Sequence, residues 1–367
     1  MLKKKTKIVI ASVLKPVDDV RNYEKVACSL AKEEMYELFM MGTIGTKNDY
    51  DSTIHLLPWP PFQRLSIARF LIQFRYFFQL KKVRPQLVII TTHELLLTSV
   101  FYRLFFKTTL VYDVQEDYHR NLQYQHFYPA IVRLPLAQLI RLTEKLCAPF
   151  IHHFLLAEAV YEQDIPFVKR CFIIIDNKSL PIQKLEKKGT FKVVFTGTIS
   201  SYSQAIESIQ LFEKIAPSFD NPQLTVIGYC PSARYRKKLV TFQSDVINLI
   251  LSDKPVPHSQ IVHEIATAHL AIIGYSPNPI NELKIPTKQY EYTAAQLPYL
   301  VRKDTHWSRL GEQLGGAIPV DFDDLDAKKI RTLFDNLDIS SIQHAAAEWT
   351  ENEQKLRETI ANILAKY

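Results

Sequence analysis

Short apolar segments rich in Ile and Val alternate with longer amphipathic segments along this chain. The first pair is residues 6–14, which predict a strand, and residues 18–32, which predict a helix with Asp19 as its N-cap. Strands that alternate with helices in this way predict βαβ units and parallel sheets. The predicted strands are residues 6–14, 36–41, 53–57, 86–91, 109–112, 152–156 and 171–175, and then 190–195, 223–227, 246–251, 270–273, 299–301 and 317–320.

The chain is too long for one core. Its 367 residues suit two domains. The segment SLPIQKLEKKG is polar, charged and contains Pro181, which is typical of a linker. We expect one domain at residues 1–180, a linker at 181–189, a second domain at 190–345, and a C-terminal helix at 346–367.

Composition excludes several classes of protein. The chain has only 9 Gly and contains neither G-x-G-x-x-G nor a Walker A loop, which argues against ordinary NAD sites and P-loop NTPases. Its four cysteines form no C-x-x-C, so they suggest neither a zinc ribbon nor a redox pair and fit a reducing cytosol. The opening MLKKKTKIVIASVLKP has too short an apolar run for an export signal and predicts a first strand. A cytoplasmic protein is expected.

The positive charge is confined to the first half. Residues 1–180 contain 24 Lys/Arg and 17 Asp/Glu, which accounts for the whole net charge of +7, while the remainder contains 21 of each kind. This asymmetry predicts domains with different partners. The charge follows no recognisable DNA- or RNA-binding motif, so no nucleic-acid partner is expected.

Two predicted helices of the first half combine aromatic and basic residues. From Trp59 to Arg84 there are six Lys/Arg, seven aromatic residues and no acid, and residues 129–147 add further cations to an apolar helix. Arg69 and Arg75 interrupt the apolar run, so it cannot span a bilayer. The composition predicts an element at an anionic membrane surface. The alternative is that many of the aromatic residues are domain core and the cations snorkel.

The stretch NELKIPTKQYEYTAAQLPYL, residues 281–300, predicts a loop, a helix and a short buried strand. Pro286 is tolerated in a first helical turn. Lys288 and Glu291 lie three residues apart and so share a helix face. A helix N-terminus with an added Lys favours a diphosphate, and a carboxylate beside it can hold a ribose hydroxyl pair. The alternative is an ordinary amphipathic surface helix.

The same stretch fits P-x-K-x-x-E-Y-x-A-x-x-x-P, which resembles the donor-binding segment of GT-B glycosyltransferases, in particular the bacterial polysaccharide and lipopolysaccharide enzymes of family 4. The resemblance implies an α/β fold of two Rossmann-like domains whose parallel sheets face across a cleft. It implies an acceptor-side domain at residues 1–180, a donor-binding domain at residues 190–345, and a helix at residues 346–367 that crosses back to the first domain. It implies that Lys288 meets the donor diphosphate and Glu291 the ribose. FKVVFTGTISSYSQAIESIQLF resembles the first βα unit of the donor domain, which adds Gly197 and Thr198 and makes Ser203 a candidate helix cap. Lys284 is a further donor-side candidate.

Segments of the first half resemble the acceptor-side domain of the same enzymes. VIITTHELLLTSV resembles a strand followed by His and an acid, here His93 and Glu94. LVYDVQEDY resembles a D-x-H-E segment in which Glu116 matches, although Gln115 replaces the His. DDVRNYEKVACSLAK contributes Arg21. The resemblance implies catalytic roles for His93, Glu116 and Lys288, acceptor-side roles for Arg21 and Glu94, and no metal.

Two positions depart from the family pattern. Many relatives have a basic residue in the loop that corresponds to residues 198–203, and this chain has none there. Many family 4 enzymes also have E-x7-E, but residue 283 is Leu, and only Glu282 lies near.

The resemblance implies a retaining, metal-independent glycosyltransferase that moves a sugar from a UDP- or GDP-sugar to a glycan or lipid-linked acceptor in polysaccharide biosynthesis. The nucleotide-sugar is a substrate, and no separate cofactor is expected. The enzyme would work in the cytoplasm, as a peripheral protein on the inner face of the cell membrane. Two alternatives remain: a nucleotide-sugar 2-epimerase of the same fold, and a non-catalytic GT-B scaffold.

Overall fold

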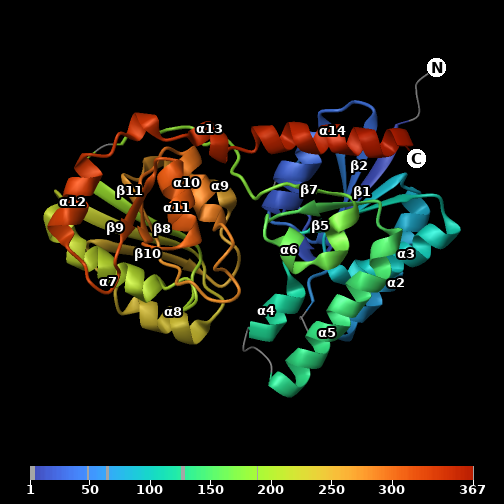
Figure 1. Cartoon of the computed structure of the whole chain (residues 1–367), viewed down its shortest axis with the longest axis horizontal. Coiled ribbons are helices and arrows are strands. Elements are labelled where there is room, and N and C mark those ends of the chain that lie inside the picture. The colour runs from blue at the N-terminus through green and yellow to red at the C-terminus, as the bar shows by residue number, and fades with distance from the viewer. Residues whose placement is uncertain (1–4, 48, 63–65, 125–128, 188, 367) are drawn as a thin grey trace. The chain divides into compact units, whose positions relative to one another are not determined.

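The structure is a computed structural model that describes residues 5–47, 49–62, 66–124, 129–187 and 189–366. The chain forms two compact units, Met1–Asn177 with Glu351–Tyr367 and Lys178–Thr350. Each unit is built around one parallel sheet with helices beside it, as Figure 1 shows. The predicted fold class, α/β with two Rossmann-like domains, is confirmed.

The first sheet has seven strands among the described residues, in the order β3-β2-β1-β4-β5-β6-β7. Every neighbouring pair is parallel. The chain starts in the middle, builds outward to β3 and then returns to β4, so the direction of building reverses between β1 and β4. The strands are β1 Thr6–Pro16, β2 Tyr36–Thr43, β3 Ile54–Trp59, β4 Leu87–Ile90, β5 Thr109–Val114, β6 His153–Leu156 and β7 Phe172–Ile174.

The second sheet repeats this arrangement with six strands among the described residues, in the order β10-β9-β8-β11-β12-β13. All its neighbours are parallel, and the reversal lies between β8 and β11. The strands are β8 Phe191–Thr198, β9 Pro222–Tyr229, β10 Ile247–Ser252, β11 Leu270–Ile273, β12 Tyr299–Arg302 and β13 Ala317–Val320.

The central strands are apolar along their whole length because helices cover both faces of a parallel sheet. β4 and β11 are examples in which every residue is buried. The helices of the first unit are η1 Val20–Ala27, α1 Cys28–Ala31, α2 Ile67–Val83, η2 His93–Leu95, α3 Leu96–Phe105, α4 Tyr118–Tyr124, α5 Ala130–Cys147, η3 Ala148–Phe150, α6 Tyr161–Asp164, η4 Pro166–Arg170 and α14 Thr350–Lys366. Those of the second unit are α7 Ala205–Ile215, η5 Ala216–Ser218, α8 Ala233–Val240, α9 His258–Thr267, α10 Thr287–Ala294, α11 His306–Gln313, α12 Ala327–Asp335, η6 Ile339–Ser341 and α13 His344–Ala347.

The first helix is wider than an α-helix. Its predicted N-cap is confirmed, since the Asp19 carboxylate accepts hydrogen bonds from the backbone N–H groups of Arg21 and Asn22. The turns that follow, η1, have π-helical hydrogen bonding before the chain tightens into α1. Side-chain spacing does not distinguish a π-turn from an α-turn over so few residues, so the sequence predicted one regular helix.

Residues 118–124, for which no element is predicted, form α4. Two local predictions are wrong. The sequence predicts one helix from residue 340 to residue 367, but residues 339–366 are divided among η6, α13 and α14. Ser203 does not cap α7, because the N-cap is Gln204 in a left-handed conformation and the Ser203 hydroxyl instead donates to the carbonyl of Ser200.

The last helix packs on the first unit. Asn352 Nδ2 donates to the carbonyl of Asp176 at 2.9 Å, and Lys355 Nζ donates to the carbonyl of Ile174 at 3.0 Å. Lys32 and Glu353 form an ion pair of 2.5 Å beside them. These contacts place the final helix, although distant in sequence, beside β7 and α1.

A buried ion pair connects η1 to the sheet of the first unit. Arg21 Nη2 and Nε donate to the two carboxylate oxygens of Asp113 at 2.8 and 3.0 Å. Arg21 Nη1 donates to the carbonyl of Ile175 and to Asn177 Oδ1. Gln115 Nε2 donates to Asp113 as well, at 2.6 Å. Burial lowers the pKa of Arg21, but the charge and hydrogen bonds of Asp113 raise it more, so its pKa lies above its ordinary value.

Asp113→Ala leaves the Arg21 guanidinium buried without its carboxylate. We expect the free energy of unfolding to fall by about 3–5 kcal/mol, the cost typical of removing one partner of a buried pair. Glu37→Ala is the control in the same unit, because its pair with Lys7 is longer and partly exposed, and we expect it to cost at most about 1 kcal/mol. Urea denaturation measures both, and equal losses would contradict a special role for the buried pair.

Candidate functional site

The residues predicted to bind the donor lie at the carboxyl edge of the second sheet. Ligands of open α/β sheets bind outside the carboxyl ends of the strands, at the point where strand order reverses. That point is the end of β8, at Gly197 and Thr198, and the end of β11, which is followed by Gly274. α10 follows the loop after β11, with Pro286 as its N-cap residue and Lys288 in its first turn.

Gly197 lies directly under the Lys288 side chain. A Cβ built on Gly197 would lie 2.7 Å from Lys288 Cε, and its φ of +102° is one that L side chains rarely adopt. Gly197 pairs with Gly228 in the sheet, and a Cβ on Gly228 would lie 1.8 Å from the Gly197 carbonyl oxygen. Glycine is needed at both positions so that the chain can bring β8, β9 and the lysine this close together.

Lys288 is a buried cation without a hydrogen-bond partner in the described part of the chain. Only 6% of the residue is exposed, and its Nζ makes no hydrogen bond there. The ammonium group instead lies over the aromatic rings of Phe195, at 4.5 Å, and Tyr275, at 5.0 Å. Burial lowers the pKa of Lys288 to about 8, against a smaller opposite effect of Glu291. An anion at this position would supply the missing partner.

Glu291 lies one turn further along α10 and contacts a histidine from a neighbouring helix. His258 Nε2 is 3.4 Å from Glu291 Oε1, and both side chains are mostly buried. No local sequence pattern connects His258 to Glu291, because the two are 33 residues apart. The histidine positions the carboxylate that is predicted to meet a ribose.

The other predicted donor-side residues surround this centre. Thr198 is exposed at the end of β8, and Lys284 is half-buried in the loop before α10. Arg302 is a further cation, which no sequence motif indicates. It ends β12, and its Nη2 donates to Gln204 Oε1 at 3.2 Å. Arg302 therefore places a positive charge at the start of α7, beside the loop at residues 198–203 that has no basic residue.

In the first unit, His93 lies at the carboxyl end of β4, beside the reversal of strand order. Its Nδ1 is buried without a hydrogen bond in the described residues, and the nearest carboxylate oxygen, on Glu94, is 3.8 Å away. The ring packs on Tyr118 with centroids 4.5 Å apart. Burial lowers the pKa of His93, an effect that Glu94 partly opposes. At neutral pH its imidazole is therefore uncharged.

Glu94 and Glu116 both lie near the phenol of Tyr118. Glu94 accepts a hydrogen bond from Arg69 Nε at 3.0 Å. Burial raises the pKa of Glu94, but His93 and Arg69 lower it more, so it is ionised at neutral pH. Glu116 is exposed and accepts from Asn121 Nδ2 at 3.1 Å. Burial and both carboxylates raise the pKa of Tyr118. The structure thus brings three predicted residues, His93, Glu94 and Glu116, around one phenol.

Arg21 lies elsewhere in the first unit, with its guanidinium engaged by Asp113, Ile175 and Asn177. Its predicted acceptor-side role stays a prediction, as do the roles of the other candidate residues. The described ranges contain no group of three or more His, Cys, Asp or Glu side chains placed to hold a metal ion.

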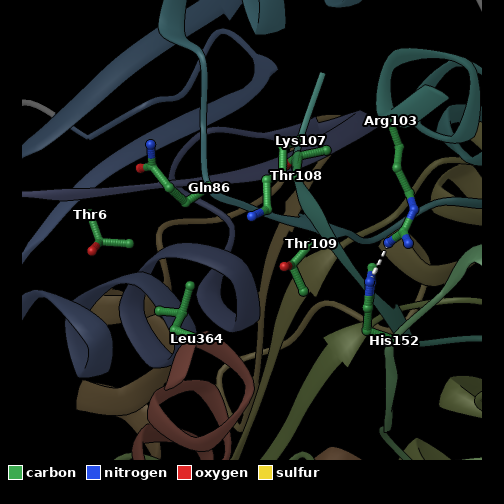
Figure 2. Close-up of a pocket in the computed structure, with 8 residues that line it drawn as sticks. All are labelled: Thr6, Gln86, Arg103, Lys107, Thr108, Thr109, His152 and Leu364. Atoms are coloured by element: carbon green, nitrogen blue, oxygen red, sulfur yellow. Dashed lines mark hydrogen bonds between the residues drawn. The ribbon is translucent and has the colours of Figure 1, made fainter. Parts of the chain in front are cut away.

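A pocket of about 530 Å³ lies at the opposite edge of the first sheet. Figure 2 shows Thr6, Gln86 and Thr109 around it, and they stand at or next to the amino ends of β1, β4 and β5. Arg103 donates to His152 there, the contact drawn as a dashed line. Because ligands of this fold bind at the carboxyl ends of the strands, this pocket is not the candidate active site.

No family model matches the chain, and no curated protein matches it. Solved structures do. A sucrose-phosphate synthase from Thermosynechococcus elongatus is 12% identical, with a TM-score of 0.68 over 99% of this chain and 100% of that one. Anabaena HepE in complex with UDP is 12% identical, with a TM-score of 0.66 over 99% and 100%. A candidate UDP-N-acetylglucosamine 2-epimerase from Listeria monocytogenes is 14% identical, with a TM-score of 0.65 over 99% and 98%. This chain has the GT-B fold that these structures share.

The contact between Gly197 and Lys288 generates a stability prediction. Gly197→Ala should lower the free energy of unfolding by about 2–4 kcal/mol, because the cost of overpacking adds to that of a positive φ. Gly189→Ala is the matched control: its φ of +74° is also positive, but a Cβ there meets nothing within 4 Å, so we expect about 1–2 kcal/mol. Chemical denaturation of both variants measures the difference, and equal losses would show that Lys288 does not restrict the space.

Proposed function

We propose that this protein is a glycosyltransferase that moves a sugar from a nucleotide-sugar donor to an acceptor. The observation that carries the proposal is the Lys288 ammonium group, buried at the carboxyl edge of the second sheet with no hydrogen-bond partner in the described residues. A buried cation is unfavourable unless it is paired. It lies in the first turn of α10, where backbone N–H groups also favour an anion. A diphosphate supplies that charge.

Lys288 then performs the electrostatic part of the reaction. When the bond between the sugar and the diphosphate breaks, negative charge develops on the leaving diphosphate. A preorganised ammonium group in a site of low dielectric stabilises that charge without reorganisation of solvent. Glu291, positioned by His258, accepts hydrogen bonds from the ribose hydroxyls and so orients the nucleotide.

We further propose that the donor is a UDP- or GDP-sugar and that transfer proceeds with retention, without a metal and without a separate cofactor. HepE, which shares the fold, is solved with UDP and with UDP-glucose, and this favours UDP.

His93, as a neutral imidazole, would hydrogen-bond a sugar hydroxyl, with Glu116 beside it. The acceptor would be a glycan or lipid-linked, in polysaccharide biosynthesis at the inner face of the cell membrane. No helix among the described residues is long and apolar enough to cross a bilayer.

A 2-epimerase of nucleotide-sugars is the second candidate, because the Listeria protein shares the fold. A thermal-shift screen of UDP- and GDP-sugars first identifies the nucleotide. Incubation with the stabilising donor then separates the candidates: glycosyl transfer consumes donor only when an acceptor is added, whereas epimerisation interconverts free donor. A protein that no nucleotide stabilises would be a non-catalytic scaffold, and the proposal would be wrong.

Lys288→Ala should weaken binding of UDP about 10–100-fold, since a hydrogen bond to a charged group contributes about 1.5–3 kcal/mol. Lys237→Ala, which removes an exposed cation from α8 of the same unit, should leave the affinity unchanged. Isothermal titration measures both, with GDP in parallel. An unchanged affinity in Lys288→Ala would remove this residue from the site.

The pH dependence follows from the lowered pKa of Lys288. A bound diphosphate favours the protonated ammonium group and raises its pKa above the value of about 8 in the free protein. Above that pH the lysine must take up a proton to bind, so affinity should fall by up to about tenfold per pH unit. Titrations between pH 7 and about 9.5 measure this slope. Lys288→Met should abolish it, and an equal slope in that variant would assign it to another group.

A further inference from the structure

A second pocket, of about 940 Å³, lies within the first unit. Its size is within the range of about 300–1,000 Å³ typical of small-molecule sites. Its described lining comes from α2, α3 and α5 and from η2, the short turn that contains His93. Figure 1 shows these three long helices side by side beneath the first sheet, and α3 contacts both α2 and α5.

The lining is mainly aromatic and aliphatic, and much of it is open to solvent. Phe70, Phe74 and Phe78 of α2 are exposed by 69%, 57% and 62% of their surface. Phe101 of α3 and Leu139 of α5 are exposed in the same pocket. The opposite face of α2 packs in the core. A contiguous exposed apolar surface of this kind is unusual on a soluble protein and marks a binding surface.

The pocket also contains residues of the candidate acceptor site. Arg69, Glu94 and His93 line it together with the phenylalanines. One continuous cavity therefore runs from the apolar helices to the polar group at the carboxyl end of β4. A ligand that fills it has a hydrocarbon part and a polar part.

The charge of the surrounding surface selects the kind of ligand. Neither α2 nor α3 contains an acidic residue, and Glu144 of α5 is buried. The exposed cations of α2 are Arg75, Lys81 and Lys82, and α5 adds Lys145. Phosphate head groups complement such a surface. A second copy of this chain would present the same positive charge and be repelled.

We propose that this pocket binds the hydrocarbon chain of a phosphate-bearing lipid, drawn from an anionic bilayer on which α2, α3 and α5 rest. The polar end of the lipid lies at Arg69, Glu94 and His93. The identity of the lipid rests on the proposed function, in which this lipid is the sugar acceptor. Its hydrocarbon chain holds the accepting group beside His93. The acceptor is thus lipid-linked and not a free glycan.

Dodecyl phosphate, used below its critical micelle concentration, is the probe for the site that binds the hydrocarbon chain. Isothermal titration measures its affinity for the protein. Methyl phosphate has the same head group without the chain and should bind at least about 100-fold more weakly. Thr98→Trp fills the pocket from α3 and should weaken dodecyl phosphate binding by about tenfold or more. Leu104→Trp places the same side chain on the same helix outside the pocket and should change nothing.

Thr143→Trp fills the same pocket from α5 and guards against misfolding of a single variant. Loss of dodecyl phosphate binding in both Thr98→Trp and Thr143→Trp, with UDP binding retained, supports the proposal. Equal binding of dodecyl phosphate in wild type and both filling variants overturns it. The wild type could bind no nucleotide and still lose dodecyl phosphate binding in both filling variants. In that case the proposed function is wrong, and the site for the hydrocarbon chain is supported.

Flotation tests the bilayer part, with vesicles of equal parts phosphatidylglycerol and phosphatidylcholine and with phosphatidylcholine alone. We expect the protein to float with the anionic vesicles, and to do so less as the salt concentration rises. The double variant Phe74→Ser with Phe78→Ser should reduce flotation about tenfold. A dimer in solution that the same double variant dissociates would make the surface a contact between copies and overturn the proposal, as would equal flotation with both vesicle types.

Discussion

Parallel pairing of strands is the constraint on which the candidate site depends. In a parallel sheet every strand ends at the same edge, so the loops that follow the strands meet there whatever their separation in sequence. Where the strand order reverses, neighbouring loops leave in opposite directions and open a space. Gly197 and His93 stand at such ends in their respective sheets. The two halves of the chain therefore share one sheet topology, with different side chains at the ends of the strands.

The treatment of buried charge separates structural residues from candidate functional ones. Arg21 is buried, but Asp113 and two further oxygen atoms satisfy its guanidinium. Lys288 is equally buried, and within the described ranges its ammonium group makes no hydrogen bond and lies beside aromatic rings and a more distant carboxylate. Both residues are basic, and both were selected from the sequence. Only the second retains unused capacity to bind an anion, and the close packing of Gly197 against it keeps the ammonium group in place.

Helix α2 has one face buried in the core and another exposed to solvent. Ile72, Tyr76 and Leu80 of α2 are buried in the core of the first unit, whereas Phe70 and Phe74 of the same helix are exposed. The two interpretations of the aromatic, basic segment, core and surface, therefore each apply to part of it. Burial of one face anchors the helix, and this leaves the other face free to present aromatic side chains together with cations.

Periodicity and residue type alone determined the strands, the parallel sheets and the division into two units, because buried strands need uninterrupted apolar runs and the helices between them need a buried stripe. The Pro-Thr-Lys segment and the glycines were also visible as local patterns. Contacts between distant segments depended on the tertiary structure. These contacts join residues that no local pattern connects. They are the contact of His258 with Glu291, that of Arg302 with Gln204, the ion pair of Arg21 with Asp113, and the pocket between α2, α3 and α5. The physical reason is that hydrophobic burial follows the order of residues along each element, whereas the partner of a polar side chain depends on which elements pack together.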